Sequence, residues 1–270
     1  MSAVQKIQRE LKPAFVPTLM TSAVIPLARF KARHDPHSAS QCTGCTMRNM
    51  CMPAGLNARE IASLEDEIGA SRRIREGQPI YRAGQNSGSV YAIRSGFVKT
   101  AIMNDSGREQ VTGFHMMGEI IGLDAMGGNG HDADAIALED THVCEIPVAA
   151  LTALARDVPA LQRKVYAVVS QEVRQQREVM LFLGSMRAEE RLASFLLDLG
   201  RRYQDRGYSA TRFNLRMSRG EIGSYLGLRL ETVSRLFSRL QIERLLRVDT
   251  RFLEIVDTVG LKALIGRALN

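Results

Sequence analysis

Four cysteines are the side chains in this sequence best suited to bind a metal. Cys42, Cys45 and Cys51 follow one another in the spacing Cys-x2-Cys-x5-Cys, and Cys144 lies 93 residues beyond them. The short spacing lets one turn of chain present the sulfurs of Cys42 and Cys45 to one face. The longer spacing lets Cys51 reach a different corner of a bound group. Four thiolates are the usual ligands of a [4Fe–4S] cluster. The pattern therefore indicates an iron–sulfur site that joins an N-terminal loop to a distant segment.

Two other interpretations of the cysteines stay open. Structural zinc sites usually combine two close pairs of Cys or His ligands, and Cys144 has no close cysteine partner. His142 falls on the same strand face as Cys144 and is a candidate ligand. Thiols without a metal, either reactive or buried in a core, are the other alternative. A disulfide framework is not expected, because the chain has no secretion signal.

A second candidate site lies on a helix expected from about Leu230 to Glu243. Glu231, Ser234 and Arg235 fall at positions i, i+3 and i+4, so they share one face near the start of this helix. Arginine can donate two hydrogen bonds to guanine, glutamate can accept one from cytosine N4, and serine suits a base or a phosphate. These three side chains are candidates for reading DNA base edges. The alternative is a surface ion pair between Glu231 and Arg235.

The residues around that helix predict a winged helix-turn-helix. Ser218 can cap a helix from Arg219 to Leu226, Gly227 makes the turn, and residues 247–256 form a hairpin. Four polar side chains are expected to contact DNA phosphates, and being merely solvated is the alternative for each. They are Ser218, Arg219, Arg229 and Arg239. The core is expected to include Leu226, Val233, Leu236 and Leu240.

A long helix is expected over residues 160–184. Six of its side chains recur at alternating spacings of three and four residues, which is the pattern of a coiled-coil seam. They are Tyr166, Val169, Val173, Gln176, Met180 and Leu183. We expect this helix to pair with the same helix of a second chain, forming a homodimer. Packing of the helix on its own domain is the alternative.

Between residues 72 and 147, short apolar runs alternate with glycine, which predicts an antiparallel sandwich or jelly roll. Strands are expected at Val90–Ile93, Phe97–Thr100 and Gln110–Phe114. A turn is expected at Asn104–Gly107, and a helix at Asn57–Ile68 with Glu60 as capping-box partner. The expected fold class is α+β, with an N-terminal β-roll sensor domain, a long dimerisation helix and a C-terminal winged helix-turn-helix.

Composition and charge agree with a globular protein of about two domains. The chain has 270 residues, of which 45% are hydrophobic and 24% charged. The sequence has no run of 18 apolar residues, so it predicts no membrane-spanning helix. We therefore expect a cytoplasmic protein. The formal net charge is +7, and residues 185–270 alone carry 16 basic and 10 acidic side chains. This excess favours a polyanionic partner for the last third, with a solvated basic surface as the alternative.

Together these motifs make the chain similar to the FNR branch of the CRP/FNR family of transcription regulators, over about residues 41–257. The resemblance rests on the four cysteines, on the motif Cys42-Thr43-Gly44-Cys45, and on several short segments. The segments are Tyr91–Gly96, Gly113–His115, Leu138–Glu139, Cys144–Pro147, Ala188–Ala193 and Glu231–Leu236. The expected divisions are an extension over 1–40, a cluster-binding β-roll over 41–158, a dimerisation helix over 159–184 and a DNA-binding domain over 185–270.

The resemblance implies an oxygen sensor that controls genes of anaerobic metabolism, and not an enzyme. In this family the four cysteines hold a [4Fe–4S] cluster, and the clustered dimer binds inverted repeats with TTGAT-like half-sites. Oxygen converts the cluster toward [2Fe–2S], the dimer loosens and DNA is released. The base-reading residues of the family correspond to Glu231, Ser234 and Arg235. RNA polymerase is a further implied partner, and the turn at Asn104–Gly107 is a candidate contact or an ordinary hairpin tip.

Two features depart from the family pattern. Residues 1–40 form a longer extension than expected, and Gln176 stands where the best-known members carry an acid, so we expect a dimer less strictly switched by oxygen. The sister branch binds cyclic AMP, but residues 118–142 contain no Lys or Arg to hold its phosphate, so no cyclic nucleotide is expected. Two competing functions stay open: an electron-transfer or catalytic iron–sulfur protein, and a zinc- or thiol-dependent regulator with a small-molecule effector.

Overall fold

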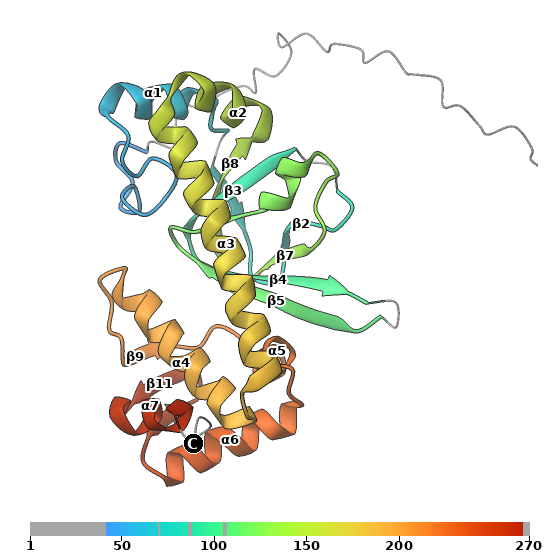
Figure 1. The fold of residues 1–270 in the computed structure, drawn as a ribbon, viewed down its shortest axis with the longest axis vertical. Helices are drawn as coiled ribbons and strands as arrows, with labels where there is room; N and C mark the ends of the chain where they lie inside the picture. Colours follow the sequence, from blue (N-terminus) through green and yellow to red (C-terminus); the bar gives the residue numbers. More distant parts are fainter. Residues whose placement is uncertain (1–41, 70, 86–87, 105–106, 267–270) are drawn as a thin grey trace, which may run out of the picture. The chain divides into compact units, whose positions relative to one another are not determined.

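The computed structural model of this chain describes four stretches, which are residues 42–69, 71–85, 88–104 and 107–266 (Figure 1). The expected N-terminal extension lies outside them, as do Asp105 and Ser106 of the expected turn. Of that turn, the Gly107 N–H donates to the Asn104 carbonyl at 2.9 Å, and the Asn104 N–H donates to the Arg108 carbonyl at 3.1 Å. These two bonds close the end of a hairpin, as the sequence predicts.

Two antiparallel four-stranded sheets form a β-roll in the described part of the chain. The first has the order β1-β8-β3-β6, with β1 at Ser71–Ile74, β8 at Thr141–Pro147, β3 at Ser89–Ser95 and β6 at Ile120–Ile121. The second has the order β2-β7-β4-β5, with β2 at Pro79–Tyr81, β7 at Asp134–Ala137, β4 at Phe97–Met103 and β5 at Glu109–Met116. Buried apolar side chains of both sheets, such as Ile93, Val98 and Val143, form one core cluster. The predicted β-roll is confirmed.

The three strands expected from the sequence are parts of β3, β4 and β5, each seven or eight residues long. The sequence analysis did not find β1, β2, β6 and β7, which contain only two to four residues each. Such short strands are too brief to show the alternation of apolar and polar residues by which strands are recognised. Strand β8 runs from Thr141 to Pro147, so Cys144 lies within it.

In the part of the chain that the structure describes, three helices and a short 3-10 turn accompany the β-roll. Helix α1 (Ala58–Glu67) begins with the predicted capping box, in which the Asn57 side chain accepts from the Glu60 N–H at 3.0 Å and the Glu60 carboxylate accepts from the Asn57 N–H at 2.8 Å. The 3-10 turn η3 covers Leu123–Gly127. Helix α2 (Val148–Asp157) leads into the long helix α3 (Pro159–Ser185), which runs past the sheets toward the C-terminal domain (Figure 1).

The C-terminal domain is a winged helix-turn-helix. Its helices are α4 (Ala188–Gln204), α5 (Arg219–Leu226), α6 (Leu230–Ile242) and α7 (Thr258–Gly266). Its sheet has the order β10-β11-β9, with β10 at Leu246–Asp249, β11 at Phe252–Ile255 and β9 at Arg212–Asn214. Ser218 caps α5 by accepting from the Glu221 N–H, and Gly227 ends it with a φ of 64°, a left-handed conformation that suits glycine. The sequence predicted this cap and turn, but not β9 or α7.

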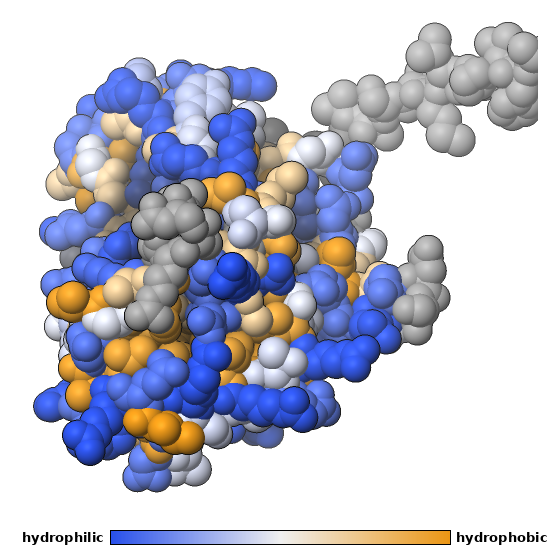
Figure 2. All heavy atoms as spheres, turned by 60° about the horizontal axis from the view of Figure 1, so that its bottom comes forward, coloured by the Kyte–Doolittle hydropathy of each residue, from blue (hydrophilic) through white to orange (hydrophobic). Residues whose placement is uncertain are grey.

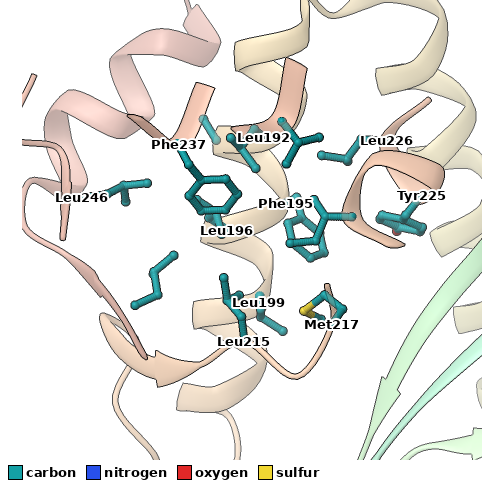
Figure 3. Close-up of a cluster of buried hydrophobic side chains, with 14 of the residues drawn as sticks. Leu192, Phe195, Leu196, Leu199, Leu215, Met217, Tyr225, Leu226, Phe237 and Leu246 are labelled. Carbon is teal, nitrogen blue, oxygen red and sulfur yellow. The ribbon is translucent and has the colours of Figure 1, made fainter. Parts of the chain in front are cut away.

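Helix α4 is the centre of the C-terminal core. Leu192, Phe195, Leu196 and Leu199 of this helix are buried and lie among side chains of the other elements, including Phe237 of α6 (Figure 3). Four residues that the sequence assigned to the core are all buried: Leu226, Val233, Leu236 and Leu240. Helices α4 and α6 therefore pack in one shared core.

Hydrophobic and hydrophilic side chains are mixed on one face of the described molecule. Hydrophobic side chains on the face shown in Figure 2 form separate areas among hydrophilic ones. Among the residues described, no helix combines the length and the apolar character that crossing a membrane requires.

Candidate metal centre and nucleic-acid interface

All four cysteines line one pocket of the β-roll. Cys42, Cys45 and Cys51 belong to the cysteine loop, which we define as residues 42–53, and Cys144 comes from β8. Apolar side chains form most of the remaining wall, including Met52, Ile68, Ala92 and Ile146. The guanidinium-bearing residues Arg48 and Arg94 are the charged members of the described lining, which contains no carboxylate.

Strand pairing carries Cys144 to the cysteine loop. In the first sheet Cys144 pairs with Ser71 of β1 on one side and with Ala92 of β3 on the other. It therefore occupies an interior strand, where the backbone on both sides fixes its position. His142 lies two residues earlier, opposite Arg73 and Ser95, and is not part of the pocket lining.

The cysteine loop is anchored by contacts with two helices. Glu65 of α1 accepts hydrogen bonds from both the N–H and the hydroxyl of Thr43, at 2.7 and 3.0 Å. Lys164 of α3 donates to the Met50 carbonyl at 3.3 Å. Within the loop, the Cys51 N–H donates to the Met47 carbonyl at 2.9 Å. The loop therefore has a defined conformation that depends on side chains outside it.

Burial raises the pKa of the Cys42 thiol to about 12, with smaller contributions from Cys144, Glu65 and Cys45. Burial also raises the pKa of Cys51 to about 12, although a hydrogen bond from the Met52 backbone opposes the shift. Both thiols are therefore protonated at neutral pH and are poor nucleophiles. A metal that binds here must displace these protons.

The donor set suits a sulfur-ligated group, although the sulfurs do not converge on one point. Within the described residues, no three or more His, Cys, Asp or Glu side chains are placed to hold a single metal ion. Zinc requires all its ligands within about 2.3 Å of one ion. In a [4Fe–4S] cluster ligated by four cysteines, the thiolates are distributed over four irons. Four thiols in a pocket without carboxylates fit such a cluster in donor chemistry.

The predicted base-reading residues share one exposed face of α6. Glu231, Ser234 and Arg235 are all exposed, whereas the opposite face buries Val233, Leu236, Phe237 and Leu240. In the described part of the chain no ion pair joins Glu231 to Arg235. Both side chains are therefore free to meet a partner from outside the protein.

The four predicted phosphate contacts differ in their surroundings. Ser218 and Arg229 are exposed at the N-termini of α5 and α6. The Arg219 guanidinium instead stacks on the Phe237 ring, 3.3 Å from its centroid, and burial lowers the pKa of Arg219 to about 10. Arg239 forms ion pairs with Glu189 of α4 and, at 3.5 Å, with Glu243. Arg219 and Arg239 thus have contacts inside the domain, which the sequence analysis did not anticipate.

The predicted seam of α3 lies mainly on its exposed side. Tyr166, Val169, Val173 and Met180 are 63%, 38%, 45% and 74% exposed, respectively. These apolar side chains are therefore available for contact with a partner, as the predicted seam requires, but the pairing itself stays a prediction. Gln176 is also exposed, and its amide donates to Glu172 at 2.8 Å. Leu183 is half-buried, and a Cβ on Gly227 would lie 3.2 Å from its Cδ2.

The sequence analysis missed a buried ionic cluster between the β-roll and α4. The Glu119 carboxylate accepts from Arg202 Nη2 at 2.8 Å and from Arg206 Nη2 at 2.6 Å. Burial alone would raise the pKa of Glu119, but the charges of Arg202 and Arg206 outweigh it and hold that pKa below its ordinary value. Arg202 lies in the last turn of α4, and Arg206 lies two residues beyond its end. The available signal in the sequence was that two arginines stand four residues apart where the helix ends.

Packed aromatic side chains fill part of the β-roll interior. His131 stacks on Tyr81 with ring centroids 3.7 Å apart, and Tyr81 stacks on Tyr91 at 5.4 Å. The His131 Nδ1 lies 2.9 Å from a carboxylate oxygen of Asp124. Among the residues described, this interior presents aromatic rings and a carboxylate.

Comparisons with known proteins agree with this architecture. Residues 71–157 match the cyclic nucleotide-binding domain family, and residues 190–264 match the Crp-like helix-turn-helix domain family. The transcriptional activator protein Anr of Pseudomonas protegens is 42% identical over 87% of this chain and 96% of its own length. The fumarate and nitrate reduction regulatory protein of Salmonella typhimurium is 40% identical over 86% of this chain and 93% of its own length.

A solved structure also has this fold. FixK2 from Bradyrhizobium japonicum superposes with a TM-score of 0.67 and 33% identity, covering 72% of this chain and 96% of that one. These relatives are transcription regulators and not enzymes. The chain therefore belongs to the FNR branch of the CRP/FNR family of transcription regulators.

Proposed function

We propose that this protein is an oxygen-sensing regulator of anaerobic metabolism whose signal is a [4Fe–4S] cluster. Cys42, Cys45, Cys51 and Cys144 would hold the cluster in the pocket of the β-roll. The observation that carries this proposal is that four thiols, drawn from a loop and a distant strand, line one pocket without a carboxylate. The printed names of relatives support the anaerobic role, including the anaerobic regulatory protein of Haemophilus influenzae.

Charge in the pocket suits a group ligated by thiolates. Arg48 and Arg94 belong to the lining, and the Lys164 ammonium lies 3.3 Å from the Met50 carbonyl beside Cys51. These cations offset the negative charge that deprotonated cysteines bring into an apolar site. When bound, the cluster supplies the oxygen-sensitive chemistry. The cysteine loop then holds the ligand sulfurs, and Glu65 and Lys164 hold the loop.

The output of the sensor is DNA binding through α6. Arg235 and Glu231 suit the guanine and cytosine of one base pair, which is consistent with the G·C pair of TTGAT-like half-sites. Ser234 lies between them on the same exposed face. Ser218 and Arg229 contact phosphates and position the helix, while Arg219 and Arg239 must first leave their present contacts to do so.

A second copy of the chain completes the regulator. The exposed seam of α3 (Tyr166, Val169, Val173, Gln176 and Met180) pairs with its counterpart, and Leu183 joins the seam at its lower end. A dimer places two α6 helices on the two halves of an inverted repeat. RNA polymerase is the further partner of the activated dimer. The hairpin end at Asn104–Gly107 is its candidate contact, and two of its four residues lie outside the described ones.

The signal is not a cyclic nucleotide. Stacked rings of Tyr81, Tyr91 and His131 occupy space inside the β-roll, and Asp124 adds a negative charge there. A cyclic phosphate needs cationic or amide donors, and residues 118–142 contain no Lys or Arg. The match to the cyclic nucleotide-binding domain family therefore reflects the shared fold of the β-roll.

Anaerobic purification followed by iron and acid-labile sulfide analysis tests the proposal. We expect about four irons and four sulfides per chain, the content of one [4Fe–4S] cluster. A broad visible absorption band should bleach on exposure to air, and binding to a TTGAT-repeat duplex should weaken at the same time. Stoichiometric zinc, or a colourless protein without iron, would refute the oxygen chemistry while leaving the DNA-binding domain in place. A cluster that cycles between redox states in air without loss would indicate electron transfer instead.

A further inference from the structure

We propose that the cysteine loop is coupled to the DNA-binding domain within one chain, through the turn formed by Gly118 and Glu119. This inference goes beyond the proposed function, because it holds whatever group occupies the cysteine pocket. It assigns positioning roles to Met50, Glu119 and Arg202, none of which belongs to the predicted sites. The coupling also differs from dimerisation, because it involves no second chain.

On one side, the turn contacts the cysteine loop. Gly118 has a φ of 88°, and a Cβ built on it would lie 3.2 Å from Met50 Cβ and 3.7 Å from Met47 Sδ. The loop therefore packs directly against the turn, with space for glycine but not for a larger residue. The two methionines lie between Cys45 and Cys51 in the sequence, so a shift of these cysteines moves them. Met50 is also the residue whose carbonyl accepts from Lys164.

The turn is fixed to the same sheet that lines the cysteine pocket. The Gly118 N–H donates to the Ile93 carbonyl at 2.8 Å, and the Ile93 N–H donates to the Glu119 carbonyl at 2.9 Å. Ile93 itself belongs to the pocket lining. The loop, the pocket wall and the turn therefore form one packed unit, so displacement of the loop also shifts the turn.

On the other side, the turn holds α4. Glu119 pairs with Arg202 and Arg206, whose side chains are only 12% and 4% exposed. Arg202 also donates to the Phe114 carbonyl at 2.6 Å, and Arg206 to the Met117 carbonyl at 2.6 Å. These four contacts join the Glu119 side chain and two carbonyls near the turn to the last turn of α4 and to the residue just beyond its C-cap. A buried ion pair of this kind has a defined geometry, because each charge loses water and depends on its partner.

Helix α4 carries the coupling into the DNA-binding site. Its residues Leu192, Phe195 and Leu196 share a core with Phe237 of α6 (Figure 3). A change at the turn therefore reorients α4 and, with it, the face of α6 that bears Arg235. Reciprocity requires that a change at α4 alters the cysteine loop to the same extent.

Hydrogen exchange on the full-length chain, without metal and without DNA, tests this reciprocity. The reporters are the loop amides of Cys45, Arg48 and Cys51, which donate within the loop in this structure. We expect Arg202→Gln to raise their exchange rates about 5-fold or more, the lower range of measured couplings between sites. From the other side, Met50→Ala should raise exchange in the α4 segment around Arg202 by a similar factor.

Two matched controls separate coupling from general loosening. Arg201→Gln changes the neighbouring arginine, which pairs only within α4 and its C-terminal cap, with Asp198 and Asp205, among the described contacts. Ser224→Ala removes a different contact between the domains, in which the Ser224 hydroxyl accepts from the Val111 N–H at 2.8 Å. Neither control should change exchange in the cysteine loop.

A double variant, Met50→Ala with Arg202→Gln, distinguishes coupling from two independent structural roles. The comparison is between its exchange rates and those of the two single variants. If both residues act through the turn, the double variant exchanges no faster than the more affected single variant. Three results would overturn the proposal. The two substitutions could multiply each other's effect on the exchange rates, or Arg202→Gln could leave exchange in the cysteine loop unchanged. Arg202→Gln could also raise exchange along β4 and β5 as much as in the loop. Loop amides without protection in the wild type would also overturn it. None of these outcomes bears on cluster content, so a failure here is distinct from a failure of the proposed function.

Discussion

The cysteine pocket and the exposed face of α6 are built in opposite ways. Three residues within five positions of one helix make the α6 face, so the helical repeat alone brings Glu231 and Arg235 together. The pocket combines a loop that starts at Cys42 with Cys144 on an interior strand, and it depends on the register of β8 between β1 and β3. A recognition surface can thus be rigid, exposed and local. The cysteine pocket is instead assembled from two parts that are distant in the sequence.

The largest effect is expected from a substitution that removes one thiol from the cysteine pocket and leaves the α6 face intact. Cys144→Ala should reduce iron and sulfide from about four each per chain to almost none, because the proposed [4Fe–4S] cluster would lose one of its four thiolate ligands. The winged helix should stay folded, since its core contains no residue of β8. Iron analysis and circular dichroism of the anaerobically purified variant measure the two effects. His142→Ala is the matched control, and full cluster content in Cys144→Ala would show that the fourth ligand lies elsewhere.

The same contrast explains what the sequence could predict. Elements set by local chemistry were found with their boundaries, such as the capping box at Asn57 and Glu60 and the helix between Ser218 and Gly227. The spacing of Cys42, Cys45 and Cys51 and the count of four cysteines predicted that Cys144 joins them, and all four line one pocket; their role as ligands stays a prediction. For these features the information lies within a few residues or in rare residue types.

Features that depend on tertiary packing were not predictable in this way. Glu119 is an ordinary acid in the sequence, and only the fold places it against Arg202 and Arg206. The stacking of Arg219 on Phe237 likewise requires α5 and α6 to be packed. Strand β6, with two residues, is defined by its pairing with Tyr91 and Ala92 of β3 and by no pattern of its own. In each case the deciding interaction joins residues that belong to different elements of the fold.

The buried ion pairs of Glu119 connect the β-roll to the C-terminal domain, and their loss should have the second-largest effect. Glu119→Gln should lower the free energy of unfolding by about 3–5 kcal/mol, because it removes the charge that two buried guanidinium groups share, leaving Arg202 only the more distant Asp198. Chemical denaturation of the metal-free protein measures this loss. Asp205→Asn is a suitable control, because Asp205 pairs with the exposed Arg201 on the surface of α4. A loss no larger than that of the control would show that the buried pair contributes little net stability.

The pH dependence of stability gives this pair a separate signature. Because the pKa of Glu119 in the folded protein lies below its ordinary value of 4.5, its ionised form stabilises the fold. That contribution is fully present above pH 4.5 and is lost as the pH falls through the lower, folded-state pKa. Wild-type stability should therefore decline in acid more steeply than that of Glu119→Gln. Parallel acid profiles for the two proteins would contradict the assignment.

The third prediction breaks the α6 face and leaves the pocket untouched. Arg235→Ala should cost about 1–3 kcal/mol of discrimination at one base pair of the half-site, because it removes two donors to guanine. Arg229→Ala is the control, since a phosphate contact should weaken binding to all sequences alike. Titration of cluster-loaded protein against duplexes substituted at each position measures both. Equal loss on every duplex for Arg235→Ala would make it a phosphate contact too.

The smallest expected effect lies on α3, between the two regions. Gln176 is neutral and bonds to Glu172, so the seam lacks the charge repulsion that an acid at this position would bring to a dimer. We therefore expect the cluster-free protein to remain dimeric at micromolar concentration in sedimentation experiments. Gln176→Asp should weaken that dimer by about 0.2–1 kcal/mol, the size measured for exposed charge pairs, and the weakening should shrink in high salt. A wild-type monomer at that concentration would show that the seam needs the loaded sensor to form. Control over dimerisation would then rest on the cysteine pocket and not on the residue at position 176.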